Sequence, residues 1–149
     1  MVKYFAILII LSASQVPAQP CLKYEPAVVK LTGVIERRKA ADVNLNEDHN
    51  PKGKWNTYYA IHLAHPICMY SDSETLAYFG WNDTISNVYE IELDNLFPAK
   101  EMDAQFKKWK KLARSQKEVI VTGKLEHAFN GNQYTDVLIE VQDPIEVKH

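Results

Sequence analysis

The sequence has no apolar run long enough to cross a lipid bilayer, no excess of positive charge and only two cysteines. Its apolar run from Tyr4 to Leu11 is far shorter than the roughly 20 residues that a membrane-spanning helix needs. Its 17 basic residues stand against 19 acidic ones, whereas a nucleic-acid-binding domain usually has a basic surface. Neither the G-x-S-x-G motif of serine hydrolases nor the redox motif C-x-x-C occurs. These absences argue against a membrane-spanning protein, a nucleic-acid partner and a serine or thiol enzyme.

The N-terminal segment, "MVKYFAILIILSASQVPAQP", has the three-part layout of a secretory signal peptide. Lys3 supplies the positive charge, the apolar run follows, and small side chains lead up to a cleavage site at Ala18. We expect residues 1–18 to be a signal peptide and residues 19–149 to form one domain in the periplasm or outside the cell. Lipid attachment at Cys21 is not expected, because Pro20 stands where a bacterial lipoprotein signal has a small residue.

The two cysteines, Cys21 and Cys68, both remain after this cleavage. An isolated even pair in an oxidising compartment predicts a disulfide. The bond would close a loop of about 46 residues, for which chain-entropy estimates give a stabilisation of about 4 kcal/mol. Its expected role is to tie the N-terminus to the rest of the domain.

Alternation of apolar and polar residues predicts three strands in the first two thirds of the chain. The first lies in residues 27–38, the second begins at residue 55 and loses its regular pairing near Pro66, and the third lies in residues 85–96. The apolar positions are Val29, Leu31 and Ile35 in the first strand, Tyr59, Ile61 and Leu63 in the second, and Tyr89, Ile91 and Leu93 in the third. Long irregular segments, residues 41–54 and 71–84, separate these strands.

A helix and two more strands are predicted in the last third. Pro98 begins a segment in which apolar side chains recur every three or four residues and should face the rest of the domain, namely Met102, Phe106, Trp109 and Ala113. Residues 119–125 and 137–141 alternate as strands joined by the turn "FNGNQ". A Thr-Gly pair follows alternating apolar residues in both the first and the fourth strand, so Gly33 and Gly123 are expected to mark sharp bends.

Three strands, a helix and two strands is the element order of the OB-fold, a five-stranded Greek-key barrel with a helix between its third and fourth strands. The segments "CLKYEPAVVKLTGVIERR", "YYAIHLAHPIC" and "VIVTGKLEHAFNGNQYTDVLIEV" also resemble a family of small exported bacterial proteins known only as a domain of unknown function. Members of that family often carry histidines in the last turn, where this chain has Asn130, Gly131, Asn132 and Gln133. The resemblance therefore implies no metal site here, and it implies no activity.

Five histidines were considered as metal ligands, but no metal site and no cofactor are predicted. His62 and His65 are three residues apart, a spacing that sends side chains to opposite faces of a strand. His127 could approach them, yet the sequence places no carboxylate or thiol beside it. Glu90 and Glu92 share a strand face, but such acids are usually solvated, so an enzyme is not expected.

An OB-fold usually binds its ligand on the outer face of its second and third strands, beside the first long loop and the loop between its last two strands. In this sequence the positions expected there are Asn56, Tyr58, His62, Glu90, Glu92 and Phe129. Tyr58 and Phe129 could provide flat surfaces for a sugar ring or a peptide. We therefore predict a non-catalytic binding domain whose ligand is a protein or glycan of the cell envelope.

Three alternatives stay open at this stage, of which a hydrolase whose site the sequence does not reveal is the least favoured. The chain could be an inhibitor or immunity-type protein that blocks an envelope-targeting enzyme, using residues 41–54 or the aromatic segment 71–84. Separately, the lysines of the predicted helix could meet an anionic surface such as a lipid headgroup, although a charged outer face is the ordinary state of an amphipathic helix.

Overall fold

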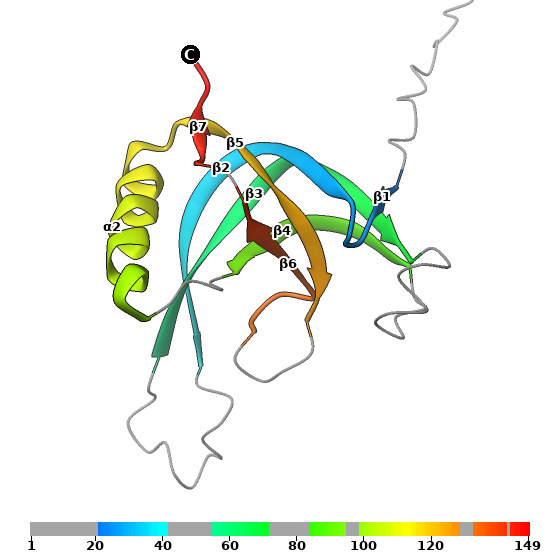
Figure 1. Ribbon diagram of the computed structural model, residues 1–149, viewed down its shortest axis with the longest axis horizontal. Coiled ribbons are helices and arrows are strands. Elements are labelled where there is room, and N and C mark those ends of the chain that lie inside the picture. The colour runs from blue at the N-terminus through cyan, green and yellow to red at the C-terminus, as the bar shows by residue number, and fades with distance from the viewer. Residues whose placement is uncertain (1–20, 42–54, 72–83, 95–98, 129–132, 143) are drawn as a thin grey trace, which may run out of the picture.

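The computed structural model describes residues 21–41, 55–71, 84–94, 99–128, 133–142 and 144–149 (Figure 1). Its elements in chain order are β1 (Leu22–Lys23), β2 (Val28–Ala41), β3 (Trp55–Tyr70), β4 (Ile85–Asp94), α2 (Ala99–Ser115), β5 (Glu118–His127), β6 (Val137–Val141) and β7 (Glu146–Val147). Outside the described residues lie the expected signal peptide, residues 42–54 and 72–83 of the two long irregular segments, and Phe129 with residues 130–132 of its turn. Within those residues, no helix has both the length and the apolar character needed to cross a membrane.

Five of the strands close into a barrel. Around the barrel the order is β2, β3, β4, β6, β5 and back to β2, and every neighbouring pair is antiparallel except β4 and β6, which run parallel. This order and the position of α2 between the third and fourth barrel strands are those of the OB-fold, so the predicted fold class is confirmed (Figure 1).

The barrel interior is filled by the apolar side of each strand. The fully buried side chains include Ile35 of β2, Ile61 of β3, Ile91 of β4, Leu125 of β5 and Ile139 of β6. Trp109 and Ala113 of α2 complete this core, and Phe106 packs against it at its edge. The predicted apolar stripe of the helix therefore faces the barrel as expected, while Lys107, Lys108, Lys110 and Lys111 remain exposed.

One face assignment in the third barrel strand is wrong. Tyr89 should lie on the same side as Ile91, but it is 46% exposed and Val88 is buried instead. The backbone of Asn87 has a positive φ of 59°, and the pairing of β3 with β4 shifts register between His62 and Ile67. Between the pairs His62–Glu90 and Ile67–Val88, β3 advances five residues but β4 only two, and this odd shift, which brackets Pro66, accompanies the reversed facing of Tyr89.

Gly33 and Gly123 each lie where a strand changes its neighbour. β2 pairs with β5 up to Val34 and with β3 from Gly33 onward, while β5 pairs with β2 up to Lys124 and with β6 from Gly123 onward. A Cβ atom on Gly33 would lie closer than 3.0 Å to the carbonyl oxygen of His62. A Cβ atom on Gly123 would lie equally close to the carbonyl oxygen of Glu140. The strand backbones approach so closely at these corners that only glycine fits.

A disulfide joins Cys21 to Cys68, whose Cα atoms lie 4.5 Å apart, as the sequence predicted. It holds β1 in parallel pairing with the end of β3, where Leu22 lies opposite Met69. Tyr24 follows directly and is fully buried in the core. The bond thus anchors the segment that leads into the barrel.

Replacing Gly33 or Gly123 by valine is expected to lower the free energy of unfolding by at least about 1 kcal/mol, because the new side chain must push a neighbouring strand away. Urea denaturation followed by circular dichroism measures this loss. The matched control is Thr32→Val, an exposed position beside Gly33, where a change within about 0.5 kcal/mol is expected. Equal midpoints for all three variants would contradict the corner assignment.

Reduction of the Cys21–Cys68 bond is expected to lower the free energy of unfolding by about 2–5 kcal/mol, because it frees a long loop in the unfolded chain. Denaturant unfolding with and without a reductant gives this value, and intact mass should show the oxidised chain lighter by two hydrogens. In the C21A/C68A variant the reductant should have no effect. A freshly isolated chain with free thiols, or one whose unfolding ignores the reductant, would refute the structural role of the bond.

Candidate functional site

The outer face of β2, β3 and β4 brings together most of the residues predicted to bind a ligand. Across β3 and β4, His62 lies opposite Glu90 and Ala60 lies opposite Glu92. Across β2 and β3, Arg38 lies opposite Tyr58. Residues on this face alternate with the core residues of the same strands, so the packing of the barrel interior determines where they lie. We call this surface the outer face.

Arg38 connects the carboxylates on the outer face. Its guanidinium contacts Glu36, and its Nη2 and Nε atoms lie 3.0 and 3.1 Å from Oε2 of Glu90. The hydroxyl of Tyr58 donates a hydrogen bond of 3.0 Å to the other oxygen, Oε1 of Glu90. Burial, followed by the Glu90 contact, raises the pKa of Tyr58 to about 12, so this phenol stays protonated and acts as a fixed donor. Both oxygens of Glu90 are thereby held in place.

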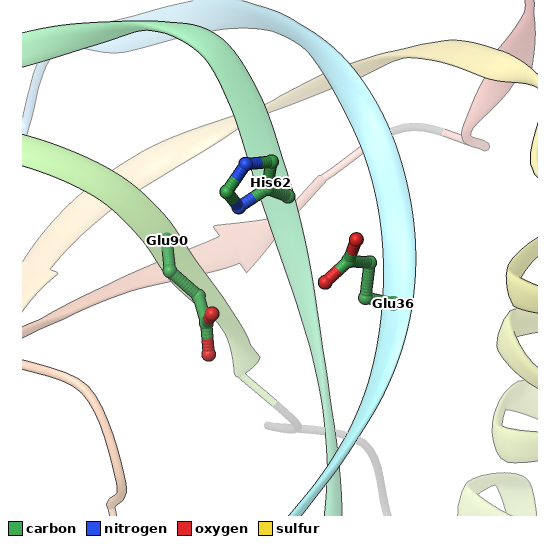
Figure 2. Close-up of side chains that lie close together, drawn as sticks. All are labelled: Glu36, His62 and Glu90. Carbon is green, nitrogen blue, oxygen red and sulfur yellow. The ribbon is translucent and has the colours of Figure 1, made fainter.

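Glu36, His62 and Glu90 form a compact cluster on the outer face (Figure 2). They come from β2, β3 and β4, and one ligand atom from each lies within 4.8 Å of the others. An imidazole with two carboxylates is a donor set suited to a transition metal such as zinc. The guanidinium of Arg38 already supplies positive charge to both carboxylates, so a metal ion would have to compete with it. The cluster therefore favours polar recognition of a ligand.

The spacing of the histidines in the sequence does not reveal this cluster. The partners of His62 are carboxylates on the two neighbouring strands and not other histidines. Glu36 and Arg38 were not predicted site residues at all, although their alternation with Ile35 places them outward. Only the register between β2 and β3, which the sequence does not state, brings them beside His62 and Tyr58.

Residues 133–136 return over one end of the outer face. The ring of Tyr134 stacks on Tyr58, with centroids 4.9 Å apart, and its hydroxyl accepts a 2.9 Å hydrogen bond from Nδ2 of Asn56. The backbone N–H of Tyr134 donates to Oε2 of Glu92 at 2.7 Å, and the backbone N–H of Glu92 donates to the hydroxyl of Thr135 at 3.1 Å. Asn56 and Glu92, both predicted to bind a ligand, thus contact this returning segment.

Glu92 is only 8% exposed as a result. Burial raises its pKa above the usual value of 4.5, while hydrogen bonds from Tyr134 and Thr135 act in the opposite direction.

No alternation of apolar and polar residues marks Tyr134 as a site residue in the sequence, because it lies outside the regular strands. At the other end of the outer face, the exposed ring of Tyr89 stacks beside His62 with centroids 6.4 Å apart.

A second cluster, Glu25, Glu126 and Glu140, lies beyond the outer face. Glu126 of β5 lies opposite Leu138 of β6, and the three carboxylates approach one another within 4.8 Å. Glu126 is 8% exposed, and burial, followed by repulsion from Glu25, Asp94 and Glu140, raises its pKa to about 7. Lys124, whose Nζ lies 3.9 Å from Glu140, opposes this shift.

A family model described as Domain of unknown function (DUF4431) matches residues 93–146. The match runs from the end of β4 through α2, β5 and β6 to the first residue of β7. It includes the closing pair of strands but not β2 and β3, which contribute most of the outer face. No curated protein matches, and no solved structure matches.

The substitution Glu126→Gln is expected to make the protein more stable at about pH 8 by on the order of 1–2 kcal/mol. The folded state keeps a proton on Glu126 between pH 4.5, its usual pKa, and about pH 7, whereas the unfolded chain releases it. The free energy of unfolding therefore falls as the pH rises from 4.5 to about 7, and the neutral amide of glutamine avoids this fall. The charged groups that act on Glu126 are not altered in this variant, namely Glu25, Asp94, Glu140 and Lys124.

Urea denaturation at several pH values measures this effect, and the gain should shrink toward about pH 4. Glu118→Gln, an exposed substitution on the same strand, is the matched control and should show no such pH-dependent gain. A Glu126→Gln variant that is less stable than the original chain at every pH would show that the carboxylate makes a favourable contact.

Proposed function

We propose that this chain is a non-catalytic binding domain of the bacterial cell envelope, and that its outer face holds a glycan. The observation that carries the proposal is the set of preorganised polar groups and aromatic rings on the side of the barrel where OB-folds bind ligands. Tyr58, Glu90 and Arg38 are locked together by hydrogen bonds, so binding would cost little further ordering of these side chains.

The chemistry of the outer face supports a sugar more than an anionic ligand. Among the described residues, Arg38 is the cation that forms ion pairs with Glu36 and Glu90, so these three side chains together carry a net negative charge. Carboxylates accept hydrogen bonds from hydroxyl groups, and the exposed ring of Tyr89 offers a flat apolar surface beside His62. A ligand rich in hydroxyl groups and with an apolar ring face would meet both features. A protein ligand is the other outcome that the experiment must distinguish.

Two features support a binding role and an exported location. Both oxygens of Glu90 are engaged by Arg38 and Tyr58, an arrangement that orients a carboxylate rather than leaving it to exchange protons with a substrate. The Cys21–Cys68 disulfide is compatible with an oxidising compartment outside the cytoplasm, where the N-terminal segment would direct the chain.

Titration of the isotopically labelled chain with soluble N-acetylated oligosaccharides from bacterial cell wall tests the proposal by NMR. Amide shifts should cluster at Tyr58, His62 and Tyr89. The Tyr89→Ala variant should raise Kd about tenfold, because it removes the exposed ring on which the sugar would stack. A similar Kd for the variant and the original chain would rule out this ring as the platform.

Val28→Ala is the matched control, since Val28 is 55% exposed but lies where β2 pairs with β5. It should leave Kd within about twofold of the original value. A parallel titration with cell-wall peptides that carry no sugar separates the two ligand classes. Shifts on the outer face with the peptides alone would favour a protein-type ligand, and shifts confined to other surfaces would refute the outer face as the binding site.

A further inference from the structure

A groove of about 810 Å³ is lined by residues of α2 and of the C-terminal segment, and no residue of the outer face lines it. Figure 1 shows the two elements beside it, α2 and β7. Its floor is apolar and is formed by Trp109 and Leu112 of α2 with Val141, Ile145 and Val147 from the end of the chain. Trp109 and Val141 belong to the barrel core, whereas Leu112, Ile145 and Val147 are only partly buried. The groove therefore continues the hydrophobic core to the surface.

Backbone pairing fixes the wall opposite the helix. In β7, Val147 lies opposite Val119 of β5, and the N–H of Lys148 donates a 2.9 Å hydrogen bond to the carbonyl of Glu118. The same two residues also form an ion pair of 2.8 Å. The C-terminal segment is thus attached to the barrel beside α2 and forms one wall of the groove. The volume of the groove lies in the range of about 300–1,000 Å³ that is typical of small-molecule sites.

The rim of the groove is cationic. Lys108, Lys111 and Lys117 line it and are exposed, and none of the described residues that line it is acidic. This contrasts with the chain as a whole, which has a net charge of -2. An apolar floor beneath a one-sided positive rim is complementary to a molecule with an apolar body and an anionic end.

We propose that this groove binds a single-chain anionic amphiphile, such as a fatty-acid carboxylate. The acyl chain lies on the partly buried Leu112, Ile145 and Val147, and burial of this apolar surface supplies the main binding energy. Trp109, which is already buried, lies at the bottom of the groove, close to the bound chain. The carboxylate lies at the rim, where Lys108 and Lys111 donate to it. The site shares no residue with the outer face, so it is independent of the proposed glycan site.

Quenching of Trp109 fluorescence tests the proposal. The full chain carrying W55F and W81F retains Trp109 as its only tryptophan. Dibrominated stearate quenches a tryptophan that it touches, so saturable quenching is expected, and palmitate should reverse it by competition. The methyl ester of the brominated acid keeps the acyl chain but has no charge, and it should bind at least about tenfold more weakly.

Charge-reversal pairs on α2 provide the matched comparison. K108E/K111E reverses two rim charges and should weaken binding of the brominated acid about tenfold. K107E/K110E makes the same change in net charge at two lysines that do not line the groove, and it should change affinity by less than about twofold. Melting curves of both variants should match that of the parent, because all four lysines are exposed.

Three results would overturn the proposal. The first is absence of saturable quenching, and the second is an equal loss of affinity in the two reversal pairs, which would indicate attraction to the whole helix rather than to the groove. The third comes from vesicles of brominated phosphatidylglycerol. If they quench Trp109 while the free acid does not, the surface is a membrane contact and not a site for a single amphiphile.

Discussion

The close approach of strand backbones at Gly33 and Gly123 is the constraint on which the rest of the structure depends. The ladder between β2 and β5 extends from one of these corners to the other, since Gly33 pairs with Val119 and Gly123 pairs with Val29. Beyond each corner the strand turns away to a different neighbour, β3 in one case and β6 in the other. Two equivalent bends thus convert a sheet into a closed barrel, which removes the exposed edges of an open sheet.

Closure also determines what the surface can do. It brings β2, β3 and β4 side by side with their core residues inward, so that Glu36, His62 and Glu90 project together on the outside. It also leaves the ladder of β5 with space for β7, whose pairing forms one wall of the apolar groove beside α2. The two proposed sites therefore depend on the same barrel but differ in chemistry. One is polar and negatively charged, and the other is apolar with a positive rim.

Local patterns in the sequence predicted the strands, the inward face of the helix and the two corners, because alternation and glycine placement act within a few neighbouring residues. The Cys21–Cys68 bond followed from composition and was confirmed. Features that depend on irregularity or register were missed. The irregular pairing of β3 with β4 accompanies the reversed facing of Tyr89. The registers of β2, β3 and β4 together bring Arg38 to Glu90, and Tyr134 reaches Tyr58 from the segment that precedes β6. Such contacts join distant segments, and no local periodicity encodes them.

β5 pairs with β2 on one edge and with β6 on the other, and this pairing shows whether the segment matched by the family model could fold alone. Residues 93–146 hold β5 together with β6 but exclude β2, the strand that pairs with residues 118–124 of β5. A polypeptide cut at those limits would present a row of unsatisfied amide and carbonyl groups to solvent or to another copy of itself. The boundaries of sequence similarity are thus narrower than the unit able to fold, and a recombinant fragment meant to be soluble must start before Val28.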